Sequence, residues 1–300
     1  MHQVARVPVP VRSRLRGYVA LTKPRIVELL LVTTVPTMVV AERGLPPLAL
    51  VFWTVLGGAL AAGGANAINM VIDRDIDAVM HRTQGRPLVT GVLSPPEALA
   101  FALGLEAAAF ALLAGFVNLL SAVLAVAATL FYVFVYTLWL KRSSTNNIVI
   151  GGAAGAVPVL VGWAAVTGSL DWAPVVLFGI IFYWTPPHFW ALAVRYREDY
   201  ARADVPMLPA VASMRTTSIR IIGYTLVLWA LTLLFSPVAG MGTIYLASAV
   251  VLGAVFTWLA VLLLRSETAE SAMRLFTWSI SYISLLFGAM ALDQLVRSGL

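Results

Sequence analysis

Residues 66–86 form a polar stretch in a chain of which only 11% of the residues are charged. Asn69, Asp73 and Asp77 recur at intervals of four residues. A helix turns by about 100° per residue, so these side chains would form a stripe that drifts by about 40° per step, with Asp75 on the opposite face. Carboxylate and amide oxygens are ligands that Mg²⁺ accepts, usually together with substrate phosphate. The spacing therefore predicts a magnesium site and catalytic residues at Asn69, Asp73 and Asp77.

Four basic residues are expected at the same depth as this stripe: Arg82, Arg86, Lys141 and Arg142. Guanidinium and ammonium groups beside a metal site suit a bound phosphate or diphosphate. Basic residues also mark the cytoplasmic ends of apolar helices, and from the residues alone both interpretations stay open. Asp73 and Asp77 carry no such topological signal, so we interpret them as site residues.

Residues 184–200 contain a second polar face. On a continuing helix, four of its side chains project into a narrow sector: His188, Arg195, Tyr196 and Asp199. A lone histidine in apolar surroundings is ordinarily a structural residue. Because Arg195 and Asp199 follow in line, a functional role for His188 is equally favoured. Whether His188 would be a metal ligand, a base or an orienting group stays open.

The composition is that of a membrane protein. Apolar residues make up 60% of the 300 residues, and the mean hydropathy is +0.90. The net charge of +6 comes without a long basic run, which argues against a nucleic-acid partner and for the lipid bilayer. The chain has no cysteine, which excludes disulfides, thiolate metal sites and thiol nucleophiles.

Apolar segments long enough to cross a bilayer predict an all-α, polytopic bundle of nine transmembrane helices in a single domain, 1–300, preceded by a basic cytoplasmic tail at 1–20. The predicted spans are 25–42, 47–70, 97–115, 119–139, 147–167, 172–191, 218–236, 242–264 and 274–296. Long polar connections follow the second and sixth spans. Because four spans separate them, we expect duplicated four-helix halves plus a ninth helix.

The basic residues between the spans fall almost entirely on one side. With nine spans, only Arg43 and Arg297 of the 20 basic residues lie on the other side. The positive-inside rule then predicts a cytoplasmic N-terminus, an external C-terminus and a site at the cytoplasmic face of a bacterial-type plasma membrane.

The polar stretches together resemble those of the UbiA superfamily of intramembrane prenyltransferases, and within it the protohaem IX farnesyltransferases, or haem O synthases. The motif N-x-x-x-D-x-x-x-D at Asn69, Asp73 and Asp77 is shared by the superfamily. The narrower resemblance lies in four longer segments: N-M-V-I-D-R-D-I-D, R-T-Q-G-R-P-L, W-T-P-P-H-F-W-A-L-A and D-Y-A-R-A-D-V-P-M-L-P. It extends from Thr22 to the last span.

This resemblance implies transfer of a farnesyl group from farnesyl diphosphate to a vinyl group of haem B, with addition of water, to give haem O. By the family pattern, the acidic stripe holds Mg²⁺-bound diphosphate, and the basic residues that contact its oxygens are Arg82, Arg86, Lys141 and Arg142. His188 would lie on the acceptor side. Members with phenolic acceptors carry a second Asp-rich motif where this chain has Arg195 and Asp199. A second metal there is therefore in doubt, and Arg195 would instead meet a haem propionate.

Two other functions stay open from the sequence. One is a prenyltransferase for an aromatic acid or quinone precursor, and the other is a secondary transporter with Asp73 and Asp77 as coupling sites. The partners expected for the first-named function are farnesyl diphosphate, haem B, the bilayer, and a downstream haem A synthase or terminal oxidase.

Overall fold

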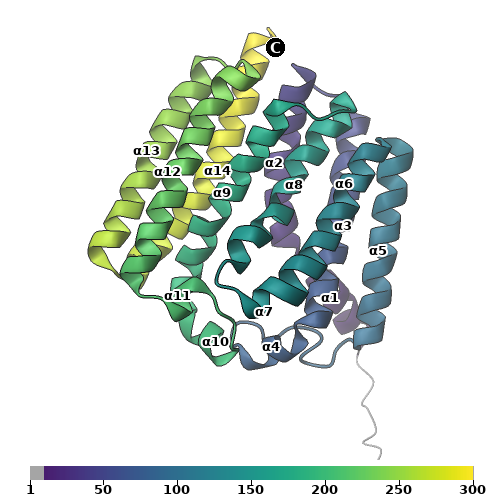
Figure 1. Ribbon diagram of the computed structural model, residues 1–300. Helices are drawn as coiled ribbons and strands as arrows, with labels where there is room; N and C mark the ends of the chain where they lie inside the picture. The colour runs from purple at the N-terminus through teal and green to yellow at the C-terminus, as the bar shows by residue number, and fades with distance from the viewer. Residues whose placement is uncertain (1–9, 300) are drawn as a thin grey trace, which may run out of the picture.

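The computed structural model describes residues 10–299, apart from the side chains of residues 25–31, and no strand occurs in that range. The long helices stand side by side in one bundle (Figure 1). At the end opposite the C-terminus lie the short helices α4 (Arg74–Val79), α7 (Lys141–Ser143), α10 (Arg197–Arg202) and α11 (Leu208–Val211). The all-α prediction is confirmed. The predicted tail residues 1–9, including Arg6, and the side chain of Arg25 lie outside the described residues.

Eight helical segments are long and apolar enough to cross a membrane, and they coincide with eight of the predicted spans. They are α3 (Leu48–Ile72), α5 (Pro95–Phe116), the segment Leu119–Ser143, α8 (Asn147–Thr167), α9 (Trp172–Arg195), α12 (Met214–Ala239), α13 (Thr243–Ser266) and α14 (Ala269–Arg297). The chain is thus an integral membrane protein. The first predicted span matches α2 (Pro24–Glu42), whose described apolar part is Val32–Glu42. The count of nine crossings stays a prediction.

The helix that carries the acidic stripe changes direction within it. Helix α3 ends at Ile72, Asp73 has φ −87° and ψ 7°, and α4 begins at the next residue. Two backbone hydrogen bonds keep the spacing of four residues: Asp73 donates to Asn69 at 2.9 Å and Asp77 donates to Asp73 at 2.8 Å. The predicted stripe therefore runs across a junction of two helices instead of along one.

The fourth predicted span is not a uniform α-helix. It consists of α6 (Leu119–Leu130), the π-helix η1 (Phe131–Leu140) and α7. In η1 the Thr137 hydroxyl donates to the Tyr132 carbonyl, five residues earlier, at 2.8 Å. Gly151 of α8 makes room for this segment, because a Cβ there would collide with the ring of Tyr136. π-helical turns often occur at functional sites.

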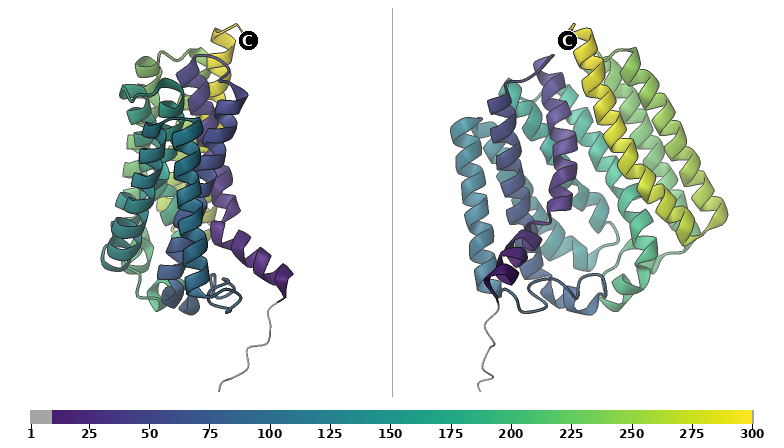
Figure 2. Two further views of the ribbon diagram at one scale, coloured as in Figure 1. Left: turned by 90° about the vertical axis from the view of Figure 1, so that its right-hand side faces the viewer. Right: turned by 180° about the vertical axis from the view of Figure 1, so that it is seen from behind.

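The two long polar connections pack against each other. Ile76 and Met80 of the first belong to the same buried apolar cluster as Tyr200 and Val205 of the second. Both connections contain short helices, although the duplication of the halves stays a prediction. Part of the predicted tail forms helix α1 (Val11–Thr22), which leaves the bundle at an angle (Figure 2).

Candidate active site

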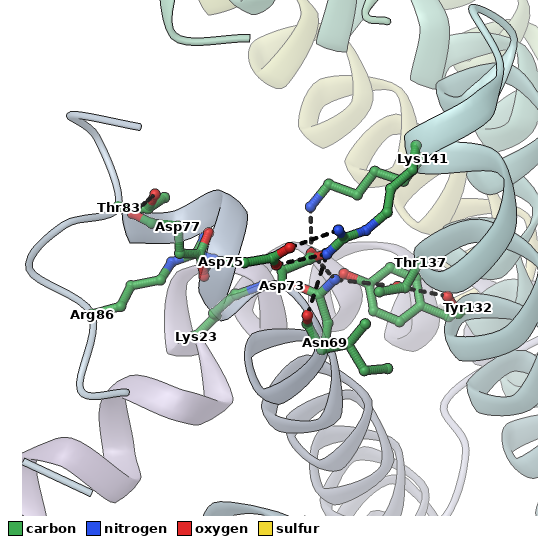
Figure 3. A network of polar contacts seen from close by, with 12 residues as sticks. Lys23, Asn69, Asp73, Asp75, Asp77, Thr83, Arg86, Tyr132, Thr137 and Lys141 are labelled. Atoms are coloured by element: carbon green, nitrogen blue, oxygen red, sulfur yellow. Dashed lines mark hydrogen bonds and ion pairs between the residues drawn. The ribbon is translucent and has the colours of Figure 1, made fainter. Parts of the chain in front are cut away.

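Asp73 lies in a polar cluster at the end of α3 (Figure 3). Its side chain is fully buried. Asn69 Nδ2 donates to Asp73 Oδ2 at 2.6 Å, and Lys141 Nζ donates to the same oxygen. Asn69 Nδ2 also donates to the Thr137 hydroxyl at 3.2 Å. The π-helix and the short helix after it therefore hold Thr137 and Lys141 against the acidic stripe.

Two further basic side chains enter this cluster. Arg86 Nη1 donates to Asp77 Oδ2 at 2.5 Å, and Lys23 Nζ donates to Asn69 Oδ1 at 3.1 Å. Lys23 joins α1 to α2 with φ 51°, a left-handed conformation that a non-glycine residue adopts at an energetic cost. Burial and the positive charges of Arg86 and Lys141 lower the pKa of Lys23 to about 7. A bound anion would favour the charged form of Lys23.

Arg142 lies at the rim of the cluster. Its two terminal nitrogens donate to the Asp75 carboxylate at 2.7 and 2.8 Å, and one of them is 3.7 Å from Asp73 Oδ1. The hydrogen bonds from Arg142 lower the pKa of Asp75 to about 2. Asp75 is exposed, in agreement with its expected position away from the stripe. Around the three carboxylates, the cationic side chains thus exceed the anionic ones in number.

The donor set fits a magnesium ion. Asp73 and Asp77 are buried, and Asp73 Oδ1 is a buried atom that accepts no hydrogen bond from any described residue. Such an oxygen has lost its hydrogen bonds to water without gaining a hydrogen-bond donor from the protein. A bound cation would compensate for this loss. Among the described residues, no three or more His, Cys, Asp or Glu side chains gather closely enough to hold an ion. A magnesium ion at Asn69, Asp73 and Asp77 would therefore need phosphate oxygens to complete its coordination.

The second polar face is divided in the structure. Arg82 and Arg195 lie over the ring of Tyr196, with 5.5 and 6.0 Å from the guanidinium carbon to the ring centroid. Asp199 Oδ2 accepts a hydrogen bond from the backbone N–H of Arg82 at 3.3 Å, and Asp199 also pairs with Arg202. Because α9 ends at Arg195 and α10 begins at residue 197, these side chains do not share one continuous helix.

His188 lies apart from that group. It is buried, with 8% of its surface exposed. Nδ1 is 2.6 Å from the Ser279 hydroxyl on α14, and the ring stacks on Trp184 with 4.3 Å between centroids. Within the described part of the chain, the hydrogen bond and ring contacts of His188 all involve α9 and α14. The structure does not bring His188 into contact with Arg195 or Asp199.

Sequence reasoning missed three residues of these networks: Lys23, Thr137 and Ser279. Lys23 directly precedes the first predicted span, where a basic residue is typical of the cytoplasmic side and marks no site. Thr137 and Ser279 lie in apolar spans, 68 and 91 residues from their partners Asn69 and His188. No local pattern marks either residue.

Comparison with known proteins shows relatives along almost the whole chain. Residues 30–286 match the model of the UbiA prenyltransferase family. "Protoheme IX farnesyltransferase" of Streptomyces coelicolor is 53% identical, covering 96% of this chain and 93% of that protein. "Protoheme IX farnesyltransferase 1" of Saccharopolyspora erythraea is 55% identical, covering 96% of this chain and 92% of that protein.

Solved structures share the fold. A structure described as digeranylgeranylglyceryl phosphate synthase has a TM-score of 0.78 at 18% identity, covering 94% of this chain and 99% of that chain. A UbiA homologue from Archaeoglobus fulgidus, bound to GPP and Mg²⁺, has a TM-score of 0.61 at 17% identity, with coverages of 91% and 99%. At these identities the likeness is one of architecture.

Proposed function

This chain belongs to the UbiA prenyltransferase family, and we propose that it transfers a farnesyl group from farnesyl diphosphate to a vinyl group of haem B, with addition of water, to give haem O. Relatives that are 51% to 55% identical over almost the full length carry the name protoheme IX farnesyltransferase. The structural observation that carries the proposal is the buried Asp73 cluster with its excess of basic side chains.

The diphosphate would bind within this cluster. Lys23, Arg86 and Lys141 surround the acidic stripe and would contact phosphate oxygens, with Arg142 at the rim. Ionisation of an allylic diphosphate transfers negative charge to the departing diphosphate. Preorganised cations in a buried site stabilise that charge as it develops, without reorganisation of solvent. These residues would thus promote cleavage of the bond between the farnesyl group and the diphosphate.

Asn69, Asp73 and Asp77 would hold Mg²⁺ against the same diphosphate. The ion would supply a divalent positive charge that makes diphosphate a better leaving group. Asn69 is oriented for this role by Thr137 and Lys23, which hydrogen bond to opposite ends of its amide.

The farnesyl cation needs a water-poor surface that tolerates positive charge. Tyr132 and Tyr136 of η1 stack with 5.3 Å between ring centroids, and the Tyr132 carbonyl accepts the Thr137 hydroxyl. Their ring faces carry negative quadrupolar potential and would shield an allylic cation until the vinyl carbon attacks it.

Haem B would lie on the side of α9. Arg195, which lies over Tyr196, would bind a propionate, and His188 would face the acceptor from the same helix. The backbone N–H of Arg82 donates to Asp199 and its guanidinium lies over the ring of Tyr196, so Arg82 would contact substrate from the side of Tyr196. Both oxygens of Asp199 accept hydrogen bonds, from Arg202 and from the backbone of Arg82, and unlike Asp73 this residue keeps no buried oxygen without a donor among the described residues, which argues against a second metal ion there.

The chain would form one domain, with the site at the cytoplasmic face of the plasma membrane of a bacterial-type cell, the N-terminus inside and the C-terminus outside. Its basic residues support this orientation, and the short helices and the C-terminus lie at opposite ends of the bundle (Figure 1). Haem O would then pass to a haem A synthase or a terminal oxidase.

One incubation tests the proposed function. The purified protein in proteoliposomes is mixed with labelled farnesyl diphosphate, Mg²⁺ and either haem B or a hydroxybenzoate. We expect label in the haem fraction only, and none when EDTA replaces Mg²⁺. Label on the hydroxybenzoate instead would identify a prenyltransferase for aromatic acids, and solute flux without prenyl transfer would identify a transporter.

A further inference from the structure

Ser279 on α14 contacts α9 through both its side chain and its backbone. The residue is fully buried. Its hydroxyl oxygen lies 2.6 Å from His188 Nδ1, and its carbonyl accepts a hydrogen bond from Trp184 Nε1 at 2.8 Å. The proposed reaction, as described so far, uses neither Ser279 nor these contacts.

The proton on the Ser279 hydroxyl can be placed by counting donors. A serine hydroxyl has one proton and accepts through its lone pairs. Here the oxygen lies 2.6 Å from the backbone carbonyl of Phe276, which can only accept, so the proton points to that carbonyl. Towards His188 the hydroxyl is therefore an acceptor, and Nδ1 must carry the hydrogen.

We infer that Ser279 is a positioning residue that holds His188 as the Nδ1–H tautomer, so that Nε2 presents its lone pair to the iron of haem B. This inference rests on the proposed function. It assigns to His188 the role of fifth ligand of the iron while the vinyl group is prenylated. The sequence motifs did not distinguish this role from that of a base.

Three aromatic rings contact the imidazole of His188. The imidazole stacks on Trp184, with centroids 4.3 Å apart and planes at 20°. Phe276 lies tilted against it, with centroids 4.7 Å apart and planes at 31°, and Phe189 is nearly perpendicular to it, at 5.2 Å and 88°. Nε2 makes no hydrogen bond to any described residue. The ring is thus fixed in orientation by its faces and by Nδ1, and Nε2 is the ring nitrogen left for a ligand.

The surroundings favour an iron ligand over a base. Aromatic rings and one hydroxyl contact the imidazole, and no carboxylate among the described residues does. A base would become an imidazolium ion buried without a counter-charge, which is costly. Iron binding uses the neutral imidazole, and a hydrogen bond from its second N–H is the usual way in which such a ligand is oriented.

The placement also suits a haem whose propionate meets Arg195. Arg195 follows His188 by seven residues on α9, a helical rise of about 10 Å. That separation is comparable with the distance from the iron to a propionate carboxylate. One porphyrin could therefore contact both side chains along one helix.

The tautomer is tested without haem. The chain has 3 histidines, so ¹⁵N-histidine NMR of the protein in detergent can be assigned by comparison with His188→Ala. We expect the His188 signals of an Nδ1–H imidazole in the unsubstituted protein and a mixture of tautomers in Ser279→Ala. Ser281→Ala is the matched control, because Ser281 hydrogen bonds only within α14. An Nε2–H imidazole in the unsubstituted protein would overturn the inference.

The ligand is tested by titration with ferric haem B, followed by optical and EPR spectra. We expect His188→Gly to lose the spectrum of histidine-bound haem and to recover it when imidazole is added. Ser279→Ala should weaken iron-ligated binding by about 10- to 100-fold, as for other residues that orient a metal-bound histidine, and Ser279→Thr should retain most of it. An unchanged spectrum in His188→Gly would overturn the inference.

These outcomes separate the inference from the proposed function. If the unsubstituted protein makes haem O but His188 does not bind the iron, only the inference fails. If His188 binds haem iron as expected but label never reaches haem B, the proposed function fails. His188 would then be a haem ligand without a role in prenyl transfer.

Discussion

The two oxygens of Asp73 have different surroundings. Oδ2 accepts hydrogen bonds from Asn69 and Lys141, whereas Oδ1 is buried and accepts none within the part of the chain that the structure describes. Among the described residues, Asp77 forms a single ion pair, with Arg86. The acidic stripe therefore keeps oxygen atoms that a magnesium ion and a diphosphate could use.

We expect Asp73→Asn and Asp77→Asn each to reduce haem O formation by at least about 100-fold, because each removes a negative charge from the proposed ion site. Asp75→Asn is the matched control. Asp75 lies two residues from both Asp73 and Asp77 and is exposed, so this variant should keep most of the haem O-forming activity. Transfer of the labelled farnesyl group and the amount of each variant in the membrane are both measured. Normal turnover by either stripe variant with Mg²⁺ present would refute the metal assignment.

Lys23 provides a separate test of the diphosphate site. Lys23→Met keeps the length of the side chain and removes its charge, so we expect KM for farnesyl diphosphate to rise about 10-fold or more, with haem B binding unchanged. Arg16→Gln, on the exposed face of α1, is the control for a lost charge on the same segment. Equal effects of the two substitutions would exclude a specific role for Lys23.

The spacing of the residues predicted the members of the acidic stripe and their basic neighbours, because a periodicity of four is a local property. Contacts across the fold were not predictable in this way. Lys23, Thr137 and Ser279 act on residues 46, 68 and 91 positions away, and nothing near them in the chain marks those partners.

Among the elements, hydropathy predicted the long helices to within a few residues at most ends, because apolar length is read directly from the sequence. It did not predict the π-helix η1, since a fully apolar run has no pattern that distinguishes hydrogen bonding to the fourth residue from bonding to the fifth. The change of direction at Asp73 was missed for another reason: the spacing of four residues is kept across the junction of α3 and α4.

Two glycines of α8 allow a paired test of η1. A Cβ at Gly151 would collide with Tyr136, whereas a Cβ at Gly155 would meet nothing within 4 Å. We expect Gly151→Ala to destabilise the protein by about 1–3 kcal/mol and to reduce prenyl transfer, because the π-helix must shift. Gly155→Ala should do neither. Thermal unfolding in detergent measures the stability of each variant, and the transfer assay measures its activity. Equal stability and equal activity of the two variants would contradict the expectation.

For the whole molecule, the charge asymmetry predicted that the long polar connections lie on one side of the bundle. The structure agrees that the polar connections gather at one end, and their contact through Asp199 and Arg82 could not be predicted from charge alone. It depends on how α4 and α10 pack, which apolar residues distant in sequence determine.

The orientation in the membrane can be tested with single thiols, since the chain has no cysteine of its own. Ser169→Cys lies in the turn between α8 and α9, and Ser143→Cys lies on α7; both positions are exposed. We expect a membrane-impermeant maleimide to label the former in intact cells and the latter only after permeabilisation. The opposite result would reverse the proposed orientation.

The division of the site between the two ends of the sequence has an evolutionary consequence. All side chains proposed to ionise the prenyl diphosphate lie at or before Arg142 in the sequence. All those proposed to receive haem B lie at or after His188. Mutation in the later portion can therefore alter which nucleophile is prenylated while the apparatus that generates the carbocation is inherited intact. A chimera joining this chain up to the end of α8 to the remainder of a quinone-forming homologue would exchange one product for the other.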